Sequence, residues 1–373
     1  MNNIRKNQNR TNLLILSKSQ FGSHIDTYMY CKYLSKKYNV TYLCWDYGKS
    51  KVKLNDVKTI YISRNGNIIA RNIRYILSSI KYIRENRVEL CFIKYFTGCS
   101  ILKILFLRKN FIFDIRTGSV NSKIISRFIY NLIMRTEACF FKNVTVISQS
   151  LAQKLKLSKK ANILPVGSSH ISNSKKDFQS LKLIYVGTFN NRNLEKTIYG
   201  FYNFIKSNTT SINCKYTLIG DGDHGEKEYL FSLVKYLKLD DKVDIVGRVP
   251  FDMLKEYFDS HNIGVSFVPI TSFFDVQPVT KTFDYLLSGI PVIATATTEN
   301  KKVIKEGENG VLINDSIEDF KRGIEHMQCL RHNFSCNNIM KFAQKYHWES
   351  IVKNLENYIQ NILINKDNRI FIN

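Results

Sequence analysis

Short apolar runs alternate along the chain with longer amphipathic segments, and most runs end at glycine or at a small polar residue. Continuous apolar runs of this length are typical of strands buried in a parallel sheet, and the segments between them have the spacing of helices. This alternation predicts an α/β protein with two Rossmann-like, doubly wound domains. The runs that predict strands are 13–16, 40–45, 89–93, 111–115 and 144–147 in the first half, and 181–187, 214–222 (with a glycine turn), 243–250, 263–269 and 292–294 in the second.

A polar, strand-poor run at residues 171–180 separates the two sets of strands and is expected to be the interdomain linker. A chain of 373 residues is too long for one compact core. We therefore expect an N-terminal domain over residues 1–178 and a C-terminal domain over residues 179–345. Residues 346–373 begin with the pattern of an amphipathic helix, which we expect to pack back towards the N-terminal domain.

Positive charge is concentrated in the first half of the chain. Residues 1–180 contain 32 Lys and Arg against 8 Asp and Glu, so this half carries the whole net charge of +24. The asymmetry indicates an anionic partner: a membrane surface, a lipid-phosphate acceptor or nucleic acid. Two segments, 99–109 and 122–135, are both apolar and basic. Each fits either a helix at a bilayer interface or an ordinary helix packed on the sheet.

The cysteine pattern and the length of the apolar runs bear on location. The eight Cys are scattered without a C-x-x-C pair, which argues against a zinc site or a disulfide framework and fits a reducing cytoplasm. No uncharged run reaches the roughly 18 residues of a spanning helix, and residues 1–12 lack the apolar core of a signal peptide. We expect a cytoplasmic protein held peripherally at the inner face of the cell membrane.

Two loops of the first domain carry candidate ligand contacts. The loop after the first strand holds a single glycine, Gly22, so it lacks the G-x-G-x-x-G fingerprint and a nicotinamide cofactor is not expected. His24 follows in the same loop and is either a ligand contact or a helix-start residue. The loop 114–119 leaves a strand end, where α/β sheets place ligand-binding groups. Arg116 and Thr117 there are candidate contacts for the donor or the acceptor.

Residues 278–294 are the most informative stretch of the second half. Lys281 and Asp284 lie three positions apart on one face of a short predicted helix, which Gly289 caps and Pro291 prevents from continuing. A helix N-terminus favours a diphosphate, and a carboxylate one turn later accepts hydrogen bonds from ribose hydroxyls. The alternative is an ordinary αβ unit with a solvated Lys–Asp pair.

Five segments of the second half follow one another in the order and spacing of a known family. They are V-G-T-F-N-N-R-N-L-E-K (186–196), L-I-G-D-G-D (218–223), V-G-R-V-P (246–250), P-V-T-K-T-F-D-Y-L-L-S-G-I-P-V-I-A (278–294) and G-E-N-G-V-L-I (307–313). In these segments the chain resembles the group 1 (family 4) glycosyltransferases of the GT-B fold, whose two Rossmann-like domains face each other across a cleft. The resemblance implies transfer of a sugar from a nucleotide diphosphate sugar with retention of anomeric configuration. It implies neither a metal ion nor a cofactor.

The resemblance also assigns roles to individual residues. A basic pair, here Arg192 and Lys196, stabilises the charge that grows on the leaving diphosphate. The backbone of the 248–250 loop lines the nucleotide base, and Asp284 stands where the family has a glutamate that holds the ribose. Residues expected at the donor site are Gly22, Gly187, Thr188, Arg248, Val249, Asp275, Thr280, Lys281 and Asp284.

The sequence departs from the family pattern at two positions. Thr188 stands where a basic residue is usual, and Val276 stands where an acid is usual. Asp275 is one step from that second position, and we expect it to serve through a shifted loop. The D-x-D sequence at 221–223 lies in a glycine turn, so we interpret it as structural and not as a metal site.

Three classes of function account for parts of the sequence. The first is a glycosyltransferase with a lipid-linked saccharide or polysaccharide acceptor, whose basic half meets an anionic membrane. The second is a nucleotide-sugar epimerase of the same fold, which would be expected to carry more acid–base groups. The third is a non-catalytic basic protein that binds membranes or nucleic acid. The sequence shows neither a recognition helix nor aromatic residues interleaved on strands, so nucleic acid is not expected. The first class explains both the motifs and the charge.

Overall fold

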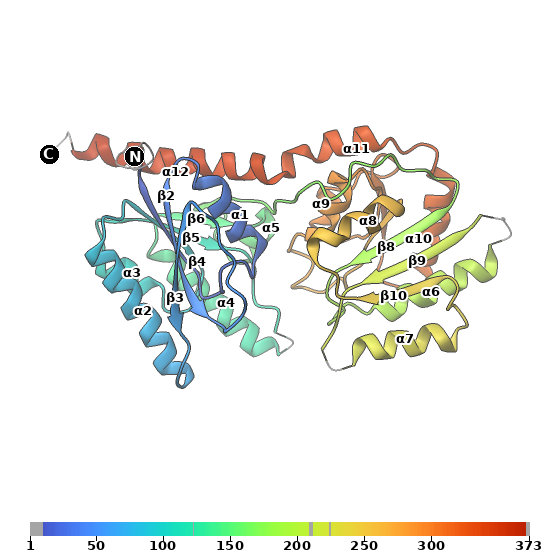
Figure 1. Cartoon of the computed structure of the whole chain (residues 1–373), viewed down its shortest axis with the longest axis horizontal. Helices are drawn as coiled ribbons and strands as arrows, with labels where there is room; N and C mark the ends of the chain where they lie inside the picture. Colours follow the sequence, from blue (N-terminus) through green and yellow to red (C-terminus); the bar gives the residue numbers. More distant parts are fainter. Residues whose placement is uncertain (1–9, 122, 209–211, 224, 371–373) are drawn as a thin grey trace. The chain divides into compact units, whose positions relative to one another are not determined.

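The computed structural model describes residues 10–121, 123–208, 212–223 and 225–370. The chain divides into two compact units, Met1–Val166 with Trp348–Asn373, and Gly167–His347. Figure 1 colours both units in chain order. The run at 171–180, expected as a linker, lies within the second unit, and the C-terminal residues from Trp348 onwards belong to the first.

The sheet of the first unit is parallel, and within the described residues it has seven strands in the order β3-β2-β1-β4-β5-β6-β7. The apolar runs predict five of these strands, and the structure confirms them. The edge strands β3 and β7 escape prediction because most of their side chains are only half-buried or exposed, which leaves no continuous apolar run. The strands are β1 (Asn12–Leu16), β2 (Asn39–Asp46), β3 (Val57–Ser63), β4 (Leu90–Lys94), β5 (Asn110–Ile115), β6 (Asn143–Val146) and β7 (Ala161–Ile163).

Helices cover both faces of this sheet. The crossover from β1 to β2 runs in the opposite direction to those from β3 to β4, β4 to β5 and β5 to β6. Because parallel crossovers are right-handed, α1 is expected on one face and α2, α3 and α4 on the other. The helices of this unit are α1 (Ile25–Leu34), α2 (Ile68–Glu85), α3 (Ser100–Leu105), α4 (Ile124–Cys139), α5 (Gln149–Lys154) and α12 (Trp348–Ile370).

Helix α12 completes the core of the first unit. Its side chains at Trp348, Leu355 and Ile359 are almost fully buried, and they belong to one apolar cluster with α1 and the first strands. The Trp348 ring meets the Tyr30 ring of α1 edge to face at 6.1 Å. Burying an apolar side chain of this size stabilises the fold by about 1.5–3 kcal/mol. The last helix of the chain is therefore an integral part of the unit built by the first 166 residues.

The second unit has the same plan with fewer strands. Within the described residues its parallel sheet has six strands in the order β10-β9-β8-β11-β12-β13. The strands are β8 (Leu181–Val186), β9 (Cys214–Ile219), β10 (Val243–Gly247), β11 (Ile263–Ser266), β12 (Val292–Thr295) and β13 (Gly310–Ile313). The helices are α6 (Leu194–Ser207), α7 (Glu226–Tyr236), α8 (Leu254–Ser260), α9 (Thr280–Leu287), α10 (Ile317–Leu330) and α11 (Cys336–Ala343).

The short helix predicted within residues 278–294 is α9, and it ends as the sequence predicts. Gly289 follows it with φ of 70°, a conformation that glycine adopts without strain, and the chain then enters β12. Two parallel sheets wound in this way confirm the prediction of two Rossmann-like domains. None of the helices in the described residues has the length and apolar content that crossing a bilayer requires.

Candidate functional site

Three glycines bring neighbouring strand ends of the second unit close together. Gly187, Gly220 and Gly247 lie at the ends of β8, β9 and β10, with φ angles of 148°, 152° and 83°. The amide of Gly220 donates to Gly247 O at 2.8 Å, and a Cβ on Gly220 would lie 1.8 Å from Gly187 O. Only glycine fits there, so this edge of the sheet exposes backbone without side chains. A ligand can therefore approach the backbone closely.

Buried hydrogen bonds fix α9 beside this edge. The Tyr285 hydroxyl oxygen accepts from Val186 N at 2.9 Å, and the hydroxyls of Thr282 and Ser266 are 2.7 Å apart. The helix begins at Thr280 without a side-chain cap and with no acidic residue in its first turn. Its first N–H groups and the helix dipole therefore favour an anion at this end.

The ammonium of Lys281 is buried at the same edge. Its Nζ lies 3.3 Å from the centroid of the Tyr185 ring, and a Cβ on Gly187 would lie 3.0 Å from it. Within the described residues Nζ has no hydrogen-bond partner. Burial holds the pKa of Lys281 well below its usual range, the charge of Arg192 lowers it further, and Asp284 offsets only part of this. An anion bound beside Nζ would favour the charged form and accept a charge-assisted hydrogen bond.

Arg192 converges on the same tyrosine. It lies in the loop after β8 between two asparagines with left-handed backbone, Asn191 (φ 56°) and Asn193 (φ 52°). Its Cζ is 4.4 Å from the centroid of the Phe274 ring, and its guanidinium interacts with the Tyr185 hydroxyl. Burial lowers the pKa of Arg192, and Tyr185 partly offsets this. Two cations are therefore held by ring faces and a hydroxyl, with no carboxylate paired to either of them within the described residues.

Asp284 lies one helical turn after Lys281. Its Oδ1 accepts a short hydrogen bond from the Ser168 hydroxyl. Burial raises the pKa of Asp284 to about 6, while the Ser168 hydrogen bond and the Lys281 charge act in the opposite direction. The carboxylate still has acceptor capacity beyond this one bond, because an ionised carboxyl offers about four lone-pair directions. It is able to accept hydrogen bonds from two further hydroxyls.

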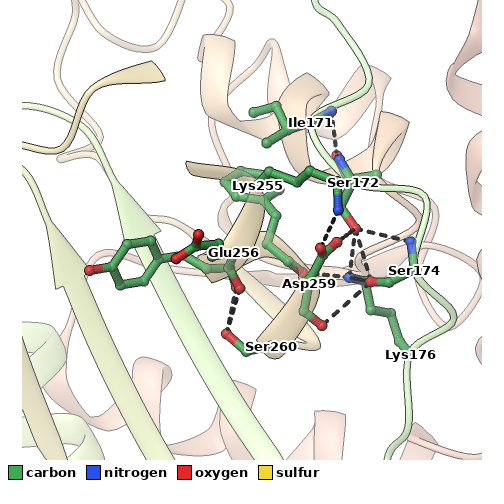
Figure 2. Close-up of polar contacts among 11 residues, drawn as sticks. Ile171, Ser172, Ser174, Lys176, Lys255, Glu256, Asp259 and Ser260 are labelled. Carbon is green, nitrogen blue, oxygen red and sulfur yellow. Dashed lines mark hydrogen bonds and ion pairs between the residues drawn. The ribbon is translucent and has the colours of Figure 1, made fainter. Parts of the chain in front are cut away.

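The segment that carries Ser168 is fastened to the rest of the second unit by a cluster of polar contacts (Figure 2). The backbone N–H of Ser172 donates to Ser288 Oγ at 3.3 Å, directly after α9. The Ser172 hydroxyl donates to Asp259 Oδ1 at 2.5 Å, and the buried ammonium of Lys176 donates to Ser174 Oγ at 2.7 Å. Burial lowers the pKa of Lys176 to about 8. These hydrogen bonds hold the segment that carries Ser168 against α8 and α9.

Two of the predicted site residues are engaged elsewhere in the second unit. Lys196 Nζ donates to Asp315 O at 2.8 Å, in the loop before α10. Both carboxylate oxygens of Asp275 accept from Thr298, Oδ1 from its N–H at 2.8 Å and Oδ2 from its hydroxyl at 2.7 Å. In this structure, neither side chain has a recorded contact with Lys281, Arg192 or Asp284 among the described residues.

The remaining second-unit candidates line the strand ends. Thr188 and Thr280 are exposed, the first directly after Gly187 and the second at the start of α9. Arg248 is exposed and Val249 half-buried in the loop that follows β10. Gly187, Thr188, Thr280, Lys281 and Asp284 are thus gathered at β8 and α9. Arg248 and Val249 lie two strands away along the same edge.

The D-x-D sequence lies in a turn that hydrogen bonds hold in place. Asp223 N donates to Asn190 Oδ1 at 2.6 Å, and Asp223 Oδ2 accepts from Asn190 Nδ2 at 2.7 Å. Asp221 O accepts from Phe189 N at 2.9 Å. These contacts tie the loop after β9 to the loop that leads to Arg192.

Three further candidate residues lie in the first unit, Arg116, His24 and Thr117. Arg116 is buried: its Nε donates to Asp26 Oδ2 at 2.9 Å and its Nη1 to Leu164 O at 2.7 Å. Its guanidinium is thus neutralised internally. His24 directly precedes α1, and burial is the main reason that its pKa is lowered. Thr117 is exposed.

Gly22 occupies a tight turn of the same unit. Its φ is 87°, and a Cβ there would lie 2.7 Å from Val52 Cγ2. The position therefore excludes other residues for two reasons, backbone strain and the close Val52 side chain. This is a structural constraint on Gly22 that holds whether or not the loop also binds a ligand.

Three residues of the site do not emerge from sequence motifs. Tyr185 lies inside a strand, where an aromatic residue is indistinguishable from core; its position two residues before Gly187 is the one usable signal. Ser168 belongs to the P-V-G-S run that precedes the expected linker, and Phe274 lies in an irregular loop. Their contacts join positions 116 and 82 residues apart in the chain for Ser168–Asp284 and Phe274–Arg192, respectively, which no local pattern reveals.

Comparisons with known proteins give a family match over part of the chain and several similar folds. Residues 180–328 match the family model "Glycosyl transferases group 1". The fold is similar to that of sucrose-phosphate synthase from Thermosynechococcus elongatus (TM-score 0.74, 16% identity, 95% of this chain and 100% of that one). It is also similar to Anabaena Alr3699/HepE in complex with UDP (0.73, 12%, 94% and 100%). A third such structure is the lipopolysaccharide outer core galactosyltransferase WaaB in its apo form (0.68, 14%, 94% and 99%). No curated protein matches the sequence significantly.

The unpartnered ammonium of Lys281 should destabilise the ligand-free protein. We expect Lys281→Met to raise the free energy of unfolding by about 1–3 kcal/mol, because it removes a buried polar group and keeps the length of the side chain. The folded-state pKa is lowered, so between that pKa and about 10.4 the unfolded chain binds a proton that the folded chain does not. Wild-type stability therefore rises with pH in this window, and the advantage of the variant should shrink.

Urea denaturation of both proteins across this pH range measures the effect. Lys301→Met, at an exposed lysine of the same unit, is the matched control and should change stability little at any pH. A variant that is less stable than the wild type at neutral pH would contradict the assignment of Lys281 as an unpaired buried cation.

Proposed function

We propose that this chain, whose fold is that of GT-B glycosyltransferases, is a group 1 glycosyltransferase whose second unit binds a nucleotide diphosphate sugar as the donor. The observation that carries the proposal is the pair of cations on Tyr185. Lys281 and Arg192 lie where the strands β8, β9 and β10 end in glycine, beside the uncapped N-terminus of α9. Neither side chain has a carboxylate partner among the described residues. A diphosphate supplies the negative charge that this arrangement lacks.

The same two cations suit the chemistry of sugar transfer. When the bond between the sugar C1 and the diphosphate oxygen breaks, its electrons pass to the diphosphate, whose negative charge grows. Preorganised cations at a buried position stabilise this charge more than they stabilise the ground state. We assign this role to Arg192 and Lys281, and we keep Lys196 as a second candidate. They supply the charge stabilisation without a metal ion.

The acceptor hydroxyl forms the new bond to C1 and loses its proton. By resemblance to the family, a leaving phosphate oxygen takes that proton on the same face, and anomeric configuration is retained. This route needs no protein nucleophile. An epimerase of the same fold would instead return an isomerised donor, so the identity of the sugar product distinguishes the two functions.

Asp284 is proposed to bind the ribose of the donor, and thermal stability in the presence of nucleotides tests this role. A nucleoside diphosphate at about a hundred times its dissociation constant stabilises the protein by roughly 2.7 kcal/mol, which a melting curve resolves. We expect a shift with one of UDP, GDP or ADP. The Asp284→Ala change should weaken its binding by about 1–3 kcal/mol, because two hydroxyls lose a charged acceptor.

The carboxyl of Asp284 adds a pH signature. Its pKa of about 6 means that the charged acceptor is present above that pH and is lost as pH falls below it. Nucleotide affinity should therefore fall below pH 6 more steeply in the wild type than in Asp284→Asn, where only protonation of the nucleotide contributes. Identical pH profiles, or unchanged affinity in Asp284→Ala, would rule out the ribose assignment.

Arg192 is proposed to act mainly in the transition state. We expect Arg192→Gln to raise the activation barrier for release of the nucleotide from the donor by about 2–4 kcal/mol and so to lower kcat. The effect on donor affinity should be smaller. Arg322→Gln, at an exposed arginine of the same unit, should leave both constants unchanged. A change confined to the donor KM would make Arg192 a binding residue and not a catalytic one.

We further propose that the first unit meets an anionic membrane that carries a lipid-linked saccharide or polysaccharide acceptor. Helix α4 exposes a row of large apolar side chains, among them Ile125 at 75% and Phe128 at 66% exposure, next to Lys123 and Arg127. Helices α2 and α3, on the same face of the sheet, expose further apolar residues. These are Ile68, Ile69, Ile73 and Leu77 on α2, with Ile101, Ile104, Leu105 and Leu107 on or after α3. The excess of 32 basic over 8 acidic residues in positions 1–180 favours anionic lipid as the occupant.

Vesicle sedimentation tests this surface. The protein should bind phosphatidylcholine vesicles that contain anionic lipid, and Ile125→Ser with Phe128→Ser should weaken this binding by at least about tenfold, since each side chain contributes roughly 1.5–3 kcal/mol on burial. Phe231→Ser on α7, at an exposed aromatic position of the second unit (49% exposed), should have no effect. The proposal would be contradicted if the Ile125→Ser, Phe128→Ser double variant bound vesicles as well as Phe231→Ser does. It would also be contradicted if the protein bound duplex nucleic acid and not vesicles.

A further inference from the structure

Basic side chains gather round Trp45 in the first unit. Lys18 Nζ lies 5.2 Å from the centroid of the Trp45 ring, Arg64 Cζ 5.4 Å and Arg71 Cζ 5.7 Å. Arg64 Cζ is also 3.9 Å from the centroid of the exposed Tyr47 ring. Lys18, Arg64, Arg71 and Trp45 are called the Trp45 cluster below. None of them belongs to the motifs that the sequence shares with glycosyltransferases.

The members of the Trp45 cluster meet at one edge of the sheet. Trp45 lies near the end of β2, Lys18 follows β1, Arg64 follows β3, and Arg71 is in the first turn of α2. The strands β3, β2 and β1 are neighbours and run parallel, so their carboxyl ends lie side by side. Ligands of α/β proteins bind at this edge.

The surroundings hold the Trp45 cluster in place. Arg74 Nη1 donates to Asn65 O at 2.7 Å and so fixes the turn after β3. The Tyr75 ring packs edge to face on Trp45 at 5.7 Å, and its hydroxyl donates to Leu43 O at 2.9 Å. The cations are therefore attached to a rigid aromatic base and not to a mobile loop.

Three buried nitrogens of the Trp45 cluster lack a hydrogen-bond partner within the described residues, and its cations lack an anionic one. Within the described residues, none of its three cations forms an ion pair, and Arg64 Nε, Arg71 Nε and Trp45 Nε1 are buried without any hydrogen bond. Trp45 itself is 7% exposed. Lys18 Nζ donates to a neutral acceptor, Asn72 Oδ1, at 2.6 Å, and burial lowers its pKa to about 8. A buried group left in this state costs stability unless a ligand binds it.

The nearest carboxylates are committed to other groups. Asp46 pairs with Lys51 at 3.2 Å and accepts from Gly48 N at 2.8 Å. Glu137 Oε1 accepts from Gly98 N at 2.8 Å, although its charge still reaches Lys18. Three like charges are thus held together mainly by ring faces, which contribute about 0.5–2 kcal/mol each. Such a site stores uncompensated positive charge at a ligand-binding edge.

We propose that the Trp45 cluster binds a phosphate group carried by the acceptor. Guanidinium forks recognise phosphate oxygens in pairs of hydrogen bonds, and the unpaired Nε of both arginines leaves the fork intact. A carboxylate, with one charge and two oxygens, would leave most of the three cations unsatisfied. That the phosphate belongs to an acceptor rests on the proposed glycosyltransferase function; the anion site itself does not.

Trp45 reports directly on this site. The chain has two tryptophans, so Trp348→Phe leaves Trp45 as the only one. In this background, inorganic phosphate added at constant ionic strength should change the fluorescence saturably. Arg64→Gln and Arg71→Gln should each raise the dissociation constant about tenfold, because each removes a charge-assisted hydrogen bond. Calorimetric titration of the same variants without Trp348→Phe gives the answer should that background fold poorly.

Arg84→Gln is the matched control, because Arg84 is an exposed arginine of the same helix as Arg71. It should bind phosphate as the parent protein does. No saturable response to phosphate, or equal affinity in Arg64→Gln, Arg71→Gln and Arg84→Gln, would overturn the proposal. If nucleotides cause no melting shift while phosphate still changes the Trp45 fluorescence, the donor assignment is contradicted and the anion site of the Trp45 cluster is supported.

Two further ligands identify the source of the phosphate. Glucose 6-phosphate, compared with glucose, tests a soluble sugar phosphate; vesicles with phosphatidic acid, compared with pure phosphatidylcholine, test a lipid-borne phosphate. A response that Arg64→Gln removes supports the acceptor assignment for that source. Binding of inorganic phosphate with no response to either ligand would overturn the acceptor assignment.

Discussion

The proposed donor site depends on one contact, that of the Lys281 ammonium with the face of the Tyr185 ring. The ammonium nitrogen is buried 3.3 Å from the ring centroid, in the space next to Gly187 that a side chain at that position would occupy. A ring face attracts a cation without cancelling its charge, whereas a carboxylate would neutralise it. A Cβ on Gly187 would lie 3.0 Å from Lys281 Nζ, so the glycine lets the ammonium reach the ring. The ligand-free fold is accordingly strained electrostatically at this point.

The fold was predictable because parallel sheets bury their strands on both faces. Such strands appear as continuous apolar runs, and the runs locate β1 and β8 closely. The edge strand β3 breaks the rule, since all but its first position are only half-buried or exposed. The contribution of α12 to the core of the first unit could be expected only in general terms. Its partner α1 lies more than 300 residues earlier, and amphipathic spacing reveals a buried face but not what covers it.

The site was predictable where a motif is a local structure, and not where it depends on distant partners. Lys281 and Asp284 share a helix, so their spacing alone places them on one face. Lys196 has the right spacing too, yet its ammonium is held by a backbone carbonyl 119 residues away. Asp275 is bound in the same way by Thr298. Spacing shows which side chains are near one another in sequence, but the available acceptors decide where a long or charged side chain points.

The nature of the partner separates structural cations from those left for a ligand. Arg116, a candidate from the sequence, is paired with Asp26 and two backbone carbonyls, so its charge serves the fold. Lys281 in the second unit and Arg64 in the first rest on aromatic rings and have no anionic partner among the described residues. Aromatic support costs the protein part of its stability, because the buried charge stays uncompensated until an anion arrives. Ring-held cations without an anionic partner therefore support both proposed anion sites, and the shared motifs point only to the one in the second unit.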